Sequence, residues 1–167
     1  MHSFDFHSAV ARWFEQTFGS PTEPQARGWP AIQSGRHVLI SAPTGSGKTL
    51  AAFLASLDAL FREGAGTDLP DKTQVVYVSP LKALSNDIRK NLQEPLTGIR
   101  ALLRETEGHD IDVRAEVRTG DTTAAQRHGL LGAMQGIYCC VQESMFFADG
   151  IMIDIAHHID HFAGHFF

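Results

Sequence analysis

The apolar positions of the chain follow two different periods, which predict helices alternating with strands. Segments 8–18 and 49–61 repeat apolar residues at helical spacing, whereas 37–42 and 74–80 are short, β-branched runs typical of strands buried on both faces. Such alternation predicts an α/β fold, with a mostly parallel sheet and helices on both of its faces. The same patterns predict a short helix within 22–35, a helix over 82–94 that ends at Pro95, a helix opening at Thr123, and strands over 111–117, 137–141 and 150–156.

Composition limits the classes of protein to consider. A chain of 167 residues with 43% hydrophobic content suits one globular domain. Its net charge of -5 provides no general attraction for nucleic acid or an anionic membrane, so any polyanion site must be local. Cys139 and Cys140 are adjacent and cannot build an ordinary disulfide framework, which is typical of a reduced, cytoplasmic protein. With neither a signal-peptide pattern nor a membrane-length apolar segment, we expect a soluble, cytoplasmic chain without a membrane partner.

The stretch "APTGSGKT" over residues 42–49 follows a predicted strand and opens a predicted helix. Glycines there allow backbone N–H groups to converge on phosphate oxygens, and the start of the helix adds a positive dipole end. The pattern departs slightly from the common phosphate loop, because Ala42 stands at its first glycine. A plain surface turn is the alternative, but the strand-to-helix context favours phosphate binding. The candidate nucleotide-binding residues are Thr44, Gly45, Ser46, Gly47, Lys48 and Thr49.

Three stretches together resemble one helicase family. These are "FGSPTEPQARGWPAIQSGRHVLISAPTGSGKTLAAFLASLDAL", "YVSPLKALSNDIRKNL" and "VRTGDTTAAQR", in that order. They resemble the start of the large helicase-related (Lhr) proteins within the DEAD/DEAH-box helicases, from about residue 10 to 127. The resemblance implies a single RecA-like ATP-binding domain over 1–167. Its parts would be an N-terminal helix and adenine-contacting region at 1–36, a phosphate-loop core at 37–127 and a divergent tail at 128–167, where the sheet could be incomplete.

The resemblance also implies roles for particular residues, with ATP and Mg²⁺ as cofactors. Gln25 would contact the edge of adenine, which suits an amide that both donates and accepts. Lys48 would reach the β and γ phosphates, and Thr49 and Asp154 would hold the metal, so that Lys48 and Asp154 would be the catalytic residues. The partner would be single-stranded or partly duplex nucleic acid, DNA in preference to RNA. The residues implied to touch its backbone are Pro80, Leu81, Lys82, Thr119, Gly120 and Asp121.

The tail departs from the family pattern. "IYCCVQESMFF" resembles a degenerate form of the family's apolar strand followed by Thr-Pro-Glu-Ser-Leu. "IMIDIAH" resembles the Asp-Glu-x-His box with Ile155 in place of the glutamate. The spacing between the two is shorter than the family uses. If this alignment holds, Asp154 still orients magnesium, but the loss of the base costs on the order of a hundred- to ten-thousand-fold in hydrolysis rate. The alternative is that the tail is unrelated or frame-altered and that its "DIAH" is a coincidence.

Three functional hypotheses follow. The first is the ATP-binding domain of an ATP-dependent nucleic-acid helicase, inactive as an isolated chain because the second RecA-like domain, whose arginines promote hydrolysis, is missing from it. The second is a non-catalytic, ATP-dependent nucleic-acid-binding module, suggested by Ile155. The third is a metal-binding protein, because His157, His161 and His165 have helical spacing next to His158, although such a cluster also arises as a compositional accident.

Overall fold

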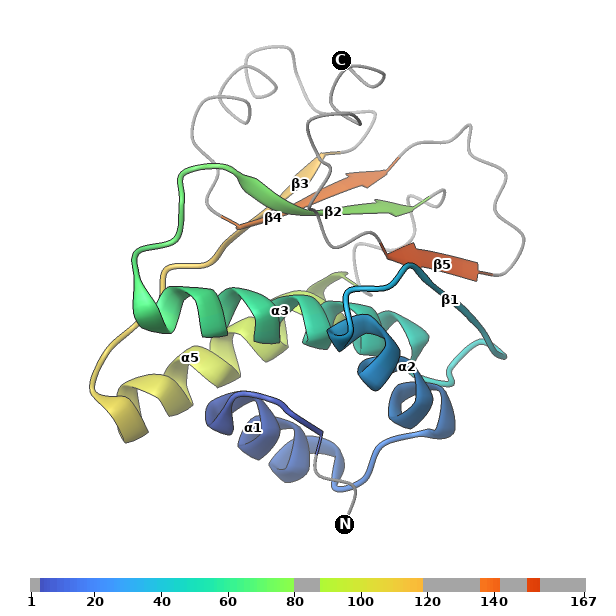
Figure 1. Cartoon of the computed structure of the whole chain (residues 1–167), viewed down its shortest axis with the longest axis horizontal. Helices are drawn as coiled ribbons and strands as arrows, with labels where there is room; N and C mark the ends of the chain where they lie inside the picture. Colours follow the sequence, from blue (N-terminus) through green and yellow to red (C-terminus); the bar gives the residue numbers. More distant parts are fainter. Residues whose placement is uncertain (1–3, 80–87, 119–135, 142–149, 154–167) are drawn as a thin grey trace.

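A computed structural model describes residues 4–79, 88–118, 136–141 and 150–153 (Figure 1). The helices are α1 (Ser8–Phe18), α2 (Glu23–Gln33), α3 (Lys48–Gly66), the π-helical turn η2 (Arg89–Gln93) and α5 (Glu94–Glu107). The strands are β1 (Val38–Ser41), β2 (Thr73–Ser79), β3 (Arg114–Arg118), β4 (Gly136–Val141) and β5 (Gly150–Ile153). All five strands and the helices at 8–18, within 22–35 and at 49–61 were predicted from the sequence.

The strands form two separate sheets in the described part of the chain. One is three-stranded in the order β2-β4-β3, with both neighbouring pairs parallel, as the alternation of elements predicts. The other pairs β1 with β5 antiparallel, from Val38 opposite Ile153 to Ser41 opposite Gly150. This antiparallel pair departs from the mostly parallel sheet that the sequence predicts.

Helix α3 lies at the centre of the hydrophobic core. Figure 1 shows it between the strands on one side and α1 and α5 on the other. Nearly all residues from Leu50 to Phe61 are buried, and the ring of Phe53 lies 4.7 Å from that of Tyr77 on β2. Helices α1, α2, α3 and α5, those of the described residues, lie on the same side of the strands in this view. The helix expected to open at Thr123 lies outside the described residues, so helices on the second face stay a prediction.

Strand β1 differs from its predicted burial. Ile40 is 8% exposed, but Leu39 is 74% exposed, so the strand is not buried on both faces. Successive side chains of a strand point to opposite faces. The face that bears Ile40 packs on α2, since Ile40 Cδ1 would lie 2.8 Å from a Cβ on Gly28. The prediction relied on the hydrophobicity of the run and did not account for which elements cover each face of the strand.

Pro95 begins a helix instead of ending one. It lies in the first turn of α5, where the lack of an N–H costs little, and the π-helical turn η2 leads directly into that turn. Helix α5 itself was not predicted, although Leu96, Ile99 and Leu103 are buried at helical spacing. Its contact with α1 is close at Gly98, since a Cβ there would clash with the indole of Trp13.

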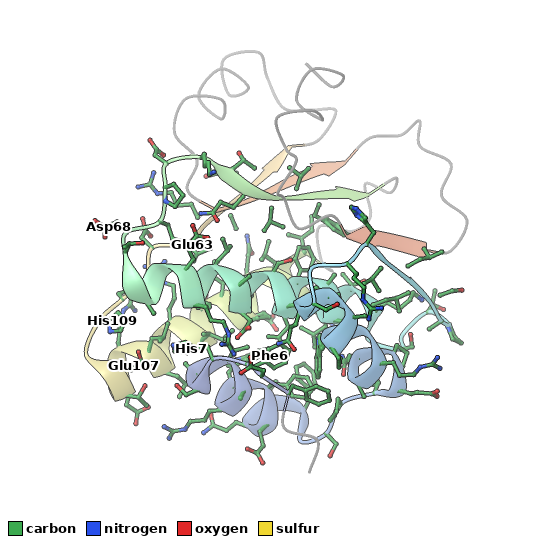
Figure 2. The ribbon with its side chains drawn as sticks, viewed as in Figure 1. Phe6, His7, Glu63, Asp68, Glu107 and His109 are labelled. Atoms are coloured by element: carbon green, nitrogen blue, oxygen red, sulfur yellow. The ribbon has the colours of Figure 1, made fainter. Side chains whose placement is uncertain are left out.

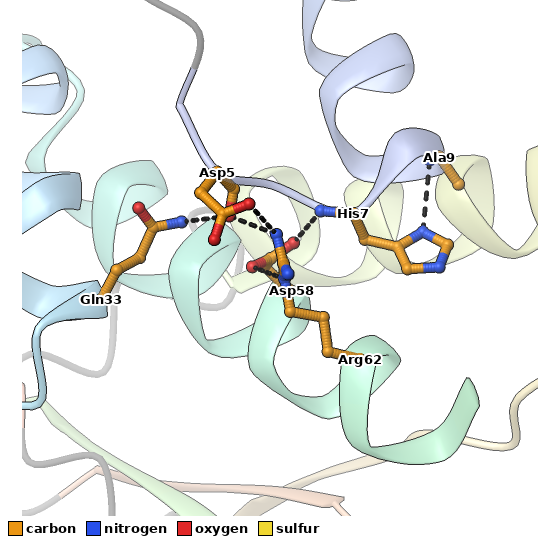
Figure 3. A network of polar contacts seen from close by, with 6 residues as sticks. All are labelled: Asp5, His7, Ala9, Gln33, Asp58 and Arg62. Atoms are coloured by element: carbon orange, nitrogen blue, oxygen red, sulfur yellow. Dashed lines mark hydrogen bonds and ion pairs between the residues drawn. The ribbon is translucent and has the colours of Figure 1, made fainter. Parts of the chain in front are cut away.

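The N-terminal segment is tied to α2 and α3 by polar contacts (Figure 3). The backbone N–H of His7 donates to Asp58 Oδ1 on α3 at 2.6 Å, and Arg62 Nε donates to Asp58 Oδ2 at 2.9 Å. Gln33 Nε2 on α2 donates to the carbonyl oxygen of Asp5 at 2.8 Å, while Arg62 also bonds to Asp5. Burial raises the pKa of the Asp58 carboxyl, against the opposing effects of the His7 N–H and Arg62. Among the described residues, no helix is long and apolar enough to cross a membrane.

Candidate nucleotide site

The glycine-rich stretch forms a tight loop between β1 and α3, and residues 42–47 are called the phosphate loop below. Gly45 has φ 80° and Gly47 has φ 85°, conformations that side chains disfavour. Gly47 is the residue directly before α3, so the loop leads straight into the first turn of the helix. The N–H of Ser46 donates to the carbonyl oxygen of Pro43 at 3.3 Å, which closes the turn.

Lys48 folds back over this loop. Its ammonium donates to the carbonyl oxygen of Pro43 at 2.9 Å and also to that of Ala42. An ammonium has three donors, so these two contacts leave one for an anion. The positive charge of Lys48 therefore lies beside the loop without needing to move there on binding. Thr49 follows it in the first turn of α3, partly buried.

Three side chains of the α2 region hold carbonyl groups of the phosphate loop and of the first turn of α3. Gln25 and Trp29 are four residues apart on α2, as are their acceptors Gly47 and Ala51 on the neighbouring segment, whereas Thr22 precedes α2 and meets the adjacent Ser46. We call the set the α2 ladder. Its three bonds run from Thr22 Oγ1 to Ser46 O at 2.8 Å, from Gln25 Nε2 to Gly47 O at 3.3 Å, and from Trp29 Nε1 to Ala51 O at 3.1 Å.

The α2 ladder determines where the donors of the loop point. In a trans peptide, the C=O of one residue and the N–H of the next point in opposite directions. When Thr22 holds the carbonyl of Ser46, the N–H of Gly47 therefore points away from α2. When Gln25 holds the carbonyl of Gly47, the N–H of Lys48 points away as well. Both are orphan donors at the start of a helix, where the dipole favours an anion.

Two further observations test whether the loop fits a phosphate group. The hydroxyl oxygen of Ser46 is buried and has no hydrogen-bond partner in the described part of the chain. A buried polar atom without a partner is costly, and a bound phosphate would supply one. At Gly47, a Cβ would lie 2.5 Å from Gln25 Nε2, so no larger residue can stand between the loop and α2. The residues therefore fit the triphosphate that the sequence predicts.

Gln25 lies closer to the loop than the sequence suggested. Its side chain is 3% exposed, with Oε1 accepting from the N–H of Thr22 at 2.9 Å and Nε2 donating to the carbonyl of Gly47. Each end of the amide keeps one further hydrogen-bonding position. The contact with adenine stays a prediction, and support of the phosphate loop is an additional role. Sequence reasoning missed Thr22 and Trp29. The Thr-x-x-Gln spacing of a capping box was a signal for Thr22, but nothing local indicated the indole bond.

The predicted metal ligand Asp154 lies outside the described residues. Strand β5, which ends directly before it, runs antiparallel to β1, so Ile153 pairs with Val38 at the end of β1 remote from the phosphate loop. A strand parallel to β1 would instead end beside the loop. The role of Asp154 stays a prediction, as does that of Thr49 toward the metal.

The predicted nucleic-acid contacts also lie outside the described residues, namely Pro80, Leu81, Lys82, Thr119, Gly120 and Asp121. The strands that precede them are described. Ser79, at the end of β2, pairs with Val141, and Arg118, at the end of β3, pairs with Cys140. Because both strands are parallel to β4, the two segments leave the three-stranded sheet from the same edge, where open α/β sheets bind ligands.

The histidine-rich tail, with His157, His158, His161 and His165, lies outside the described residues as well. Within 4–79, 88–118, 136–141 and 150–153, no group of three or more potential metal ligands is close enough to hold an ion. Metal binding by the tail stays a prediction.

Comparisons with known proteins agree with this geometry. The DEAD/DEAH box helicase family matches residues 22–149. The chain is 47% identical to the ATP-dependent helicase Lhr-Core of Methanothermobacter thermautotrophicus over 131 residues, which is 78% of this chain and 15% of that protein. It is 41% identical to the Lhr helicase/uracil glycosylase of Escherichia coli over 146 residues, 84% of this chain and 9% of that protein. The chain thus spans only a small part of the curated relatives it matches.

A solved structure is similar in fold as well as in sequence. The helicase Lhr of Mycobacterium smegmatis, bound to ssDNA and AMP-PNP, has a TM-score of 0.71 and 40% identity, covering 81% of this chain and 17% of that one. Together with the family match, this likeness gives the chain a RecA-like α/β fold. The structure contains a strand, a phosphate loop and a helix in that order, and the family match covers most of the sequence. The chain therefore belongs to the DEAD/DEAH box helicases.

Proposed function

We propose that this chain binds ATP with Mg²⁺ at the phosphate loop and the first turn of α3, as the nucleotide-binding domain of an ATP-dependent nucleic-acid helicase. The observation that carries the proposal is the α2 ladder, which turns the N–H groups of Gly47 and Lys48 away from α2 at the positive end of a helix. Membership of the helicase family supports ATP as the nucleotide.

Each residue of the site has a specific part in this proposal. The N–H groups of Gly45, Gly47 and Lys48 and the hydroxyl of Ser46 bind phosphate oxygens, and the ammonium of Lys48 neutralises their charge. Thr49 holds Mg²⁺ with Asp154, and Gln25 adds a contact to adenine. The metal, when bound, neutralises charge that develops on the β and γ phosphates.

Nucleic acid is the proposed macromolecular partner, with DNA favoured because the similar helicase of Mycobacterium smegmatis was solved with ssDNA. Residues 80–82 and 119–121 are proposed to hold its backbone. Both follow strands that end at one edge of the three-stranded sheet, which supports a single binding track. Such contacts bind phosphates and carry no sequence information.

We further infer that residues 1–167 act as one RecA-like unit, with its adenine-contacting region at 1–36, its phosphate-loop core at 37–127 and a divergent tail at 128–167. A mostly parallel sheet with helices on both faces belongs to the same proposal. The parallel order β2-β4-β3 supports it, and the antiparallel β1–β5 pair is its exception.

A second candidate function is ATP-dependent binding without hydrolysis. Two points favour it: the resemblance of the tail to the Asp-Glu-x-His box puts Ile155 in place of the glutamate, and β5 runs away from the phosphate loop. In that case the nucleotide acts as a structural switch, and binding persists without turnover.

Calorimetric titration of the full chain with Mg²⁺ and AMP-PNP tests nucleotide binding. The expected result is saturable binding that Lys48→Ala weakens by at least about tenfold, because the variant loses a charge-assisted bond to phosphate. Lys72→Ala is the matched control, since Lys72 is exposed in the loop before β2. Binding that is equally tight in the wild type and Lys48→Ala contradicts the proposal.

ATPase assays separate the two candidates. A second RecA-like domain of a relative is added in trans to the wild-type chain and to Ile155→Glu, with single-stranded DNA present. Turnover recovered only in Ile155→Glu favours a disabled helicase domain. Absence of turnover in both proteins, with nucleotide binding intact, favours the binding module.

A further inference from the structure

The side chain of Trp29, which carries one polar group in its indole N–H, is fully buried near the candidate nucleotide site. It is 0% exposed, and its indole N–H donates to the carbonyl oxygen of Ala51 at 3.1 Å. Three aromatic rings meet the indole edge to face at interplanar angles of 73–89°: Phe4 at 4.9 Å, Phe6 at 4.9 Å and Phe14 at 5.1 Å. These contacts fix the plane of the indole and thereby the direction of its N–H.

The N-terminal segment that supplies two of these rings is itself anchored. Figure 2 labels Phe6 and His7, and Figure 3 shows Asp5 and His7 joined to α2 and α3 by the polar contacts described above. Arg62 and Asp58 therefore hold the segment in place while Phe4 and Phe6 pack on Trp29. The indole is therefore held by rings from the N-terminal segment and α1 and by a hydrogen bond to α3.

Helix geometry connects Trp29 to the phosphate loop. Gln25 and Trp29 are one turn apart on α2, and their acceptors Gly47 and Ala51 are also four residues apart. Two hydrogen bonds one turn apart fix both the rotation and the axial position of α3 relative to α2. With a single hydrogen bond, α3 could still rotate about that contact. Ala51 belongs to the same first turns of α3 as Lys48, and its N–H donates to Gly47 O at 2.9 Å.

We propose that Trp29 is a positioning residue for the nucleotide site, acting through the carbonyl of Ala51 to hold the start of α3 in register with α2. The inference rests on the proposed function. A phenylalanine would fill most of the same core space, but only the indole supplies a donor to Ala51. Loss of that donor frees α3 to shift by a fraction of an ångström relative to α2. The N–H groups of Gly47 and Lys48 then no longer point directly at the phosphate oxygens.

The test compares the same chemical change at the two tryptophans. Calorimetric titrations with Mg²⁺ and AMP-PNP are run on the wild type, Trp29→Phe and Trp13→Phe at a temperature where circular dichroism shows all three folded, and their thermal midpoints are recorded. Trp13 packs on Gly98 between α1 and α5, far along the chain from the phosphate loop. Trp29→Phe should bind about three- to tenfold more weakly, the effect of one hydrogen bond, and Trp13→Phe within about twofold of the wild type.

Two results overturn the proposal. One is wild-type affinity in Trp29→Phe. The other is an equal loss of affinity in both variants, in step with their thermal midpoints, which is the behaviour of a residue that only fills the core. A wild type that does not bind nucleotide overturns the proposed function and this inference together, whereas binding that depends on Lys48 but not on Trp29 overturns this inference alone.

A second replacement covers the case in which Trp29→Phe does not fold. Trp29 is replaced by 3-benzothienylalanine, which keeps the two-ring shape and has sulfur in place of the N–H. The expected loss of nucleotide affinity is again about three- to tenfold. Unchanged affinity in this protein contradicts the role of the N–H directly.

Discussion

The side-chain amide of Gln25 occupies the space that a Cβ on Gly47 would need. Its Nε2 lies 3.3 Å from the carbonyl oxygen of Gly47 and 2.5 Å from the place of that Cβ. One residue on α2 therefore both supports the phosphate loop and requires glycine at the last position of the loop. Chemistry at the loop and packing between the helices depend on the same contact.

Gly47→Ala should impair both stability and binding. The substitution places a side chain at φ 85° and against Gln25, so we expect the free energy of unfolding to fall by about 1–2 kcal/mol. Affinity for Mg²⁺ with AMP-PNP should fall at least about tenfold, because the N–H groups of the loop are displaced. Urea denaturation and calorimetry measure the two effects.

Gly66→Ala is the matched control for Gly47→Ala. Gly66 ends α3, and a Cβ there meets nothing within 4 Å. Its stability should therefore be unchanged or slightly raised, with wild-type nucleotide affinity. Equal behaviour of the two alanine variants would show that the left-handed conformation of Gly47 is unimportant.

Gly98→Ala should destabilise the contact between α1 and α5. Alanine in a helix interior normally adds about 0.5–1 kcal/mol of stability relative to glycine, but here its Cβ clashes with the indole of Trp13. We expect a net loss of about 1–3 kcal/mol in the free energy of unfolding. The double variant with Trp13→Leu should recover part of it. A more stable Gly98→Ala protein would contradict the close approach of the two helices.

Asp110 should stabilise the fold only above acidic pH. Bonds from Arg100, at 2.8 and 2.6 Å, and from Arg104 hold the pKa of its carboxyl well below the ordinary value of 3.8. A depressed pKa contributes stability above 3.8, and that contribution is lost as the pH falls below it. Because the pair is partly exposed, Asp110→Asn should cost about 1 kcal/mol at pH 7.

Urea denaturation of the wild type and Asp110→Asn at pH 7, 5, 4 and 3 measures this dependence. The difference between the two proteins should be constant from pH 7 to 5 and shrink below about pH 4. Asp112→Asn serves as the control, since that side chain is 56% exposed and should matter less. A difference that grows on acidification would contradict the sign of the shift.

Lys82→Ala should weaken nucleic-acid binding without changing nucleotide binding. If Lys82 holds one phosphate, the slope of log affinity against log salt for single-stranded DNA should fall by about 0.7. Fluorescence anisotropy over a series of salt concentrations measures it, with Lys72→Ala as the control for loss of one positive charge. An unchanged slope in Lys82→Ala would remove this residue from the proposed binding track.

Local signals in the sequence were sufficient for the phosphate loop. Gly45 and Gly47 adopt the positive φ that a cradle of N–H groups needs, and α3 begins at Lys48, one residue before the predicted start at Thr49. These features depend only on neighbours along the chain, which is why a short motif predicts them.

Features that depend on distant residues were not predictable in the same way. Leu39 was expected to be buried because its strand is apolar, but its exposure depends on which elements cover each face of β1. Pro95 was taken as a helix end, although a proline suits the first turn of a helix equally well, and the buried positions that follow decide between the two. The partner of the Trp29 indole is set by the packing of α2 on α3 and leaves no pattern in the sequence.

Trp13 and Trp29 are the two tryptophans of the chain, and each lies in a different contact between helices. Fluorescence from a protein that keeps only one of them therefore reports the opening of one contact: α1 from α5, or α2 from α3. Coincident denaturation curves for the two single-tryptophan proteins mean that both contacts open in one cooperative transition. Separate curves, with the contact between α2 and α3 lost at the lower denaturant concentration, mean that the helices beside the phosphate loop form an independent unfolding unit that opens while the rest stays folded.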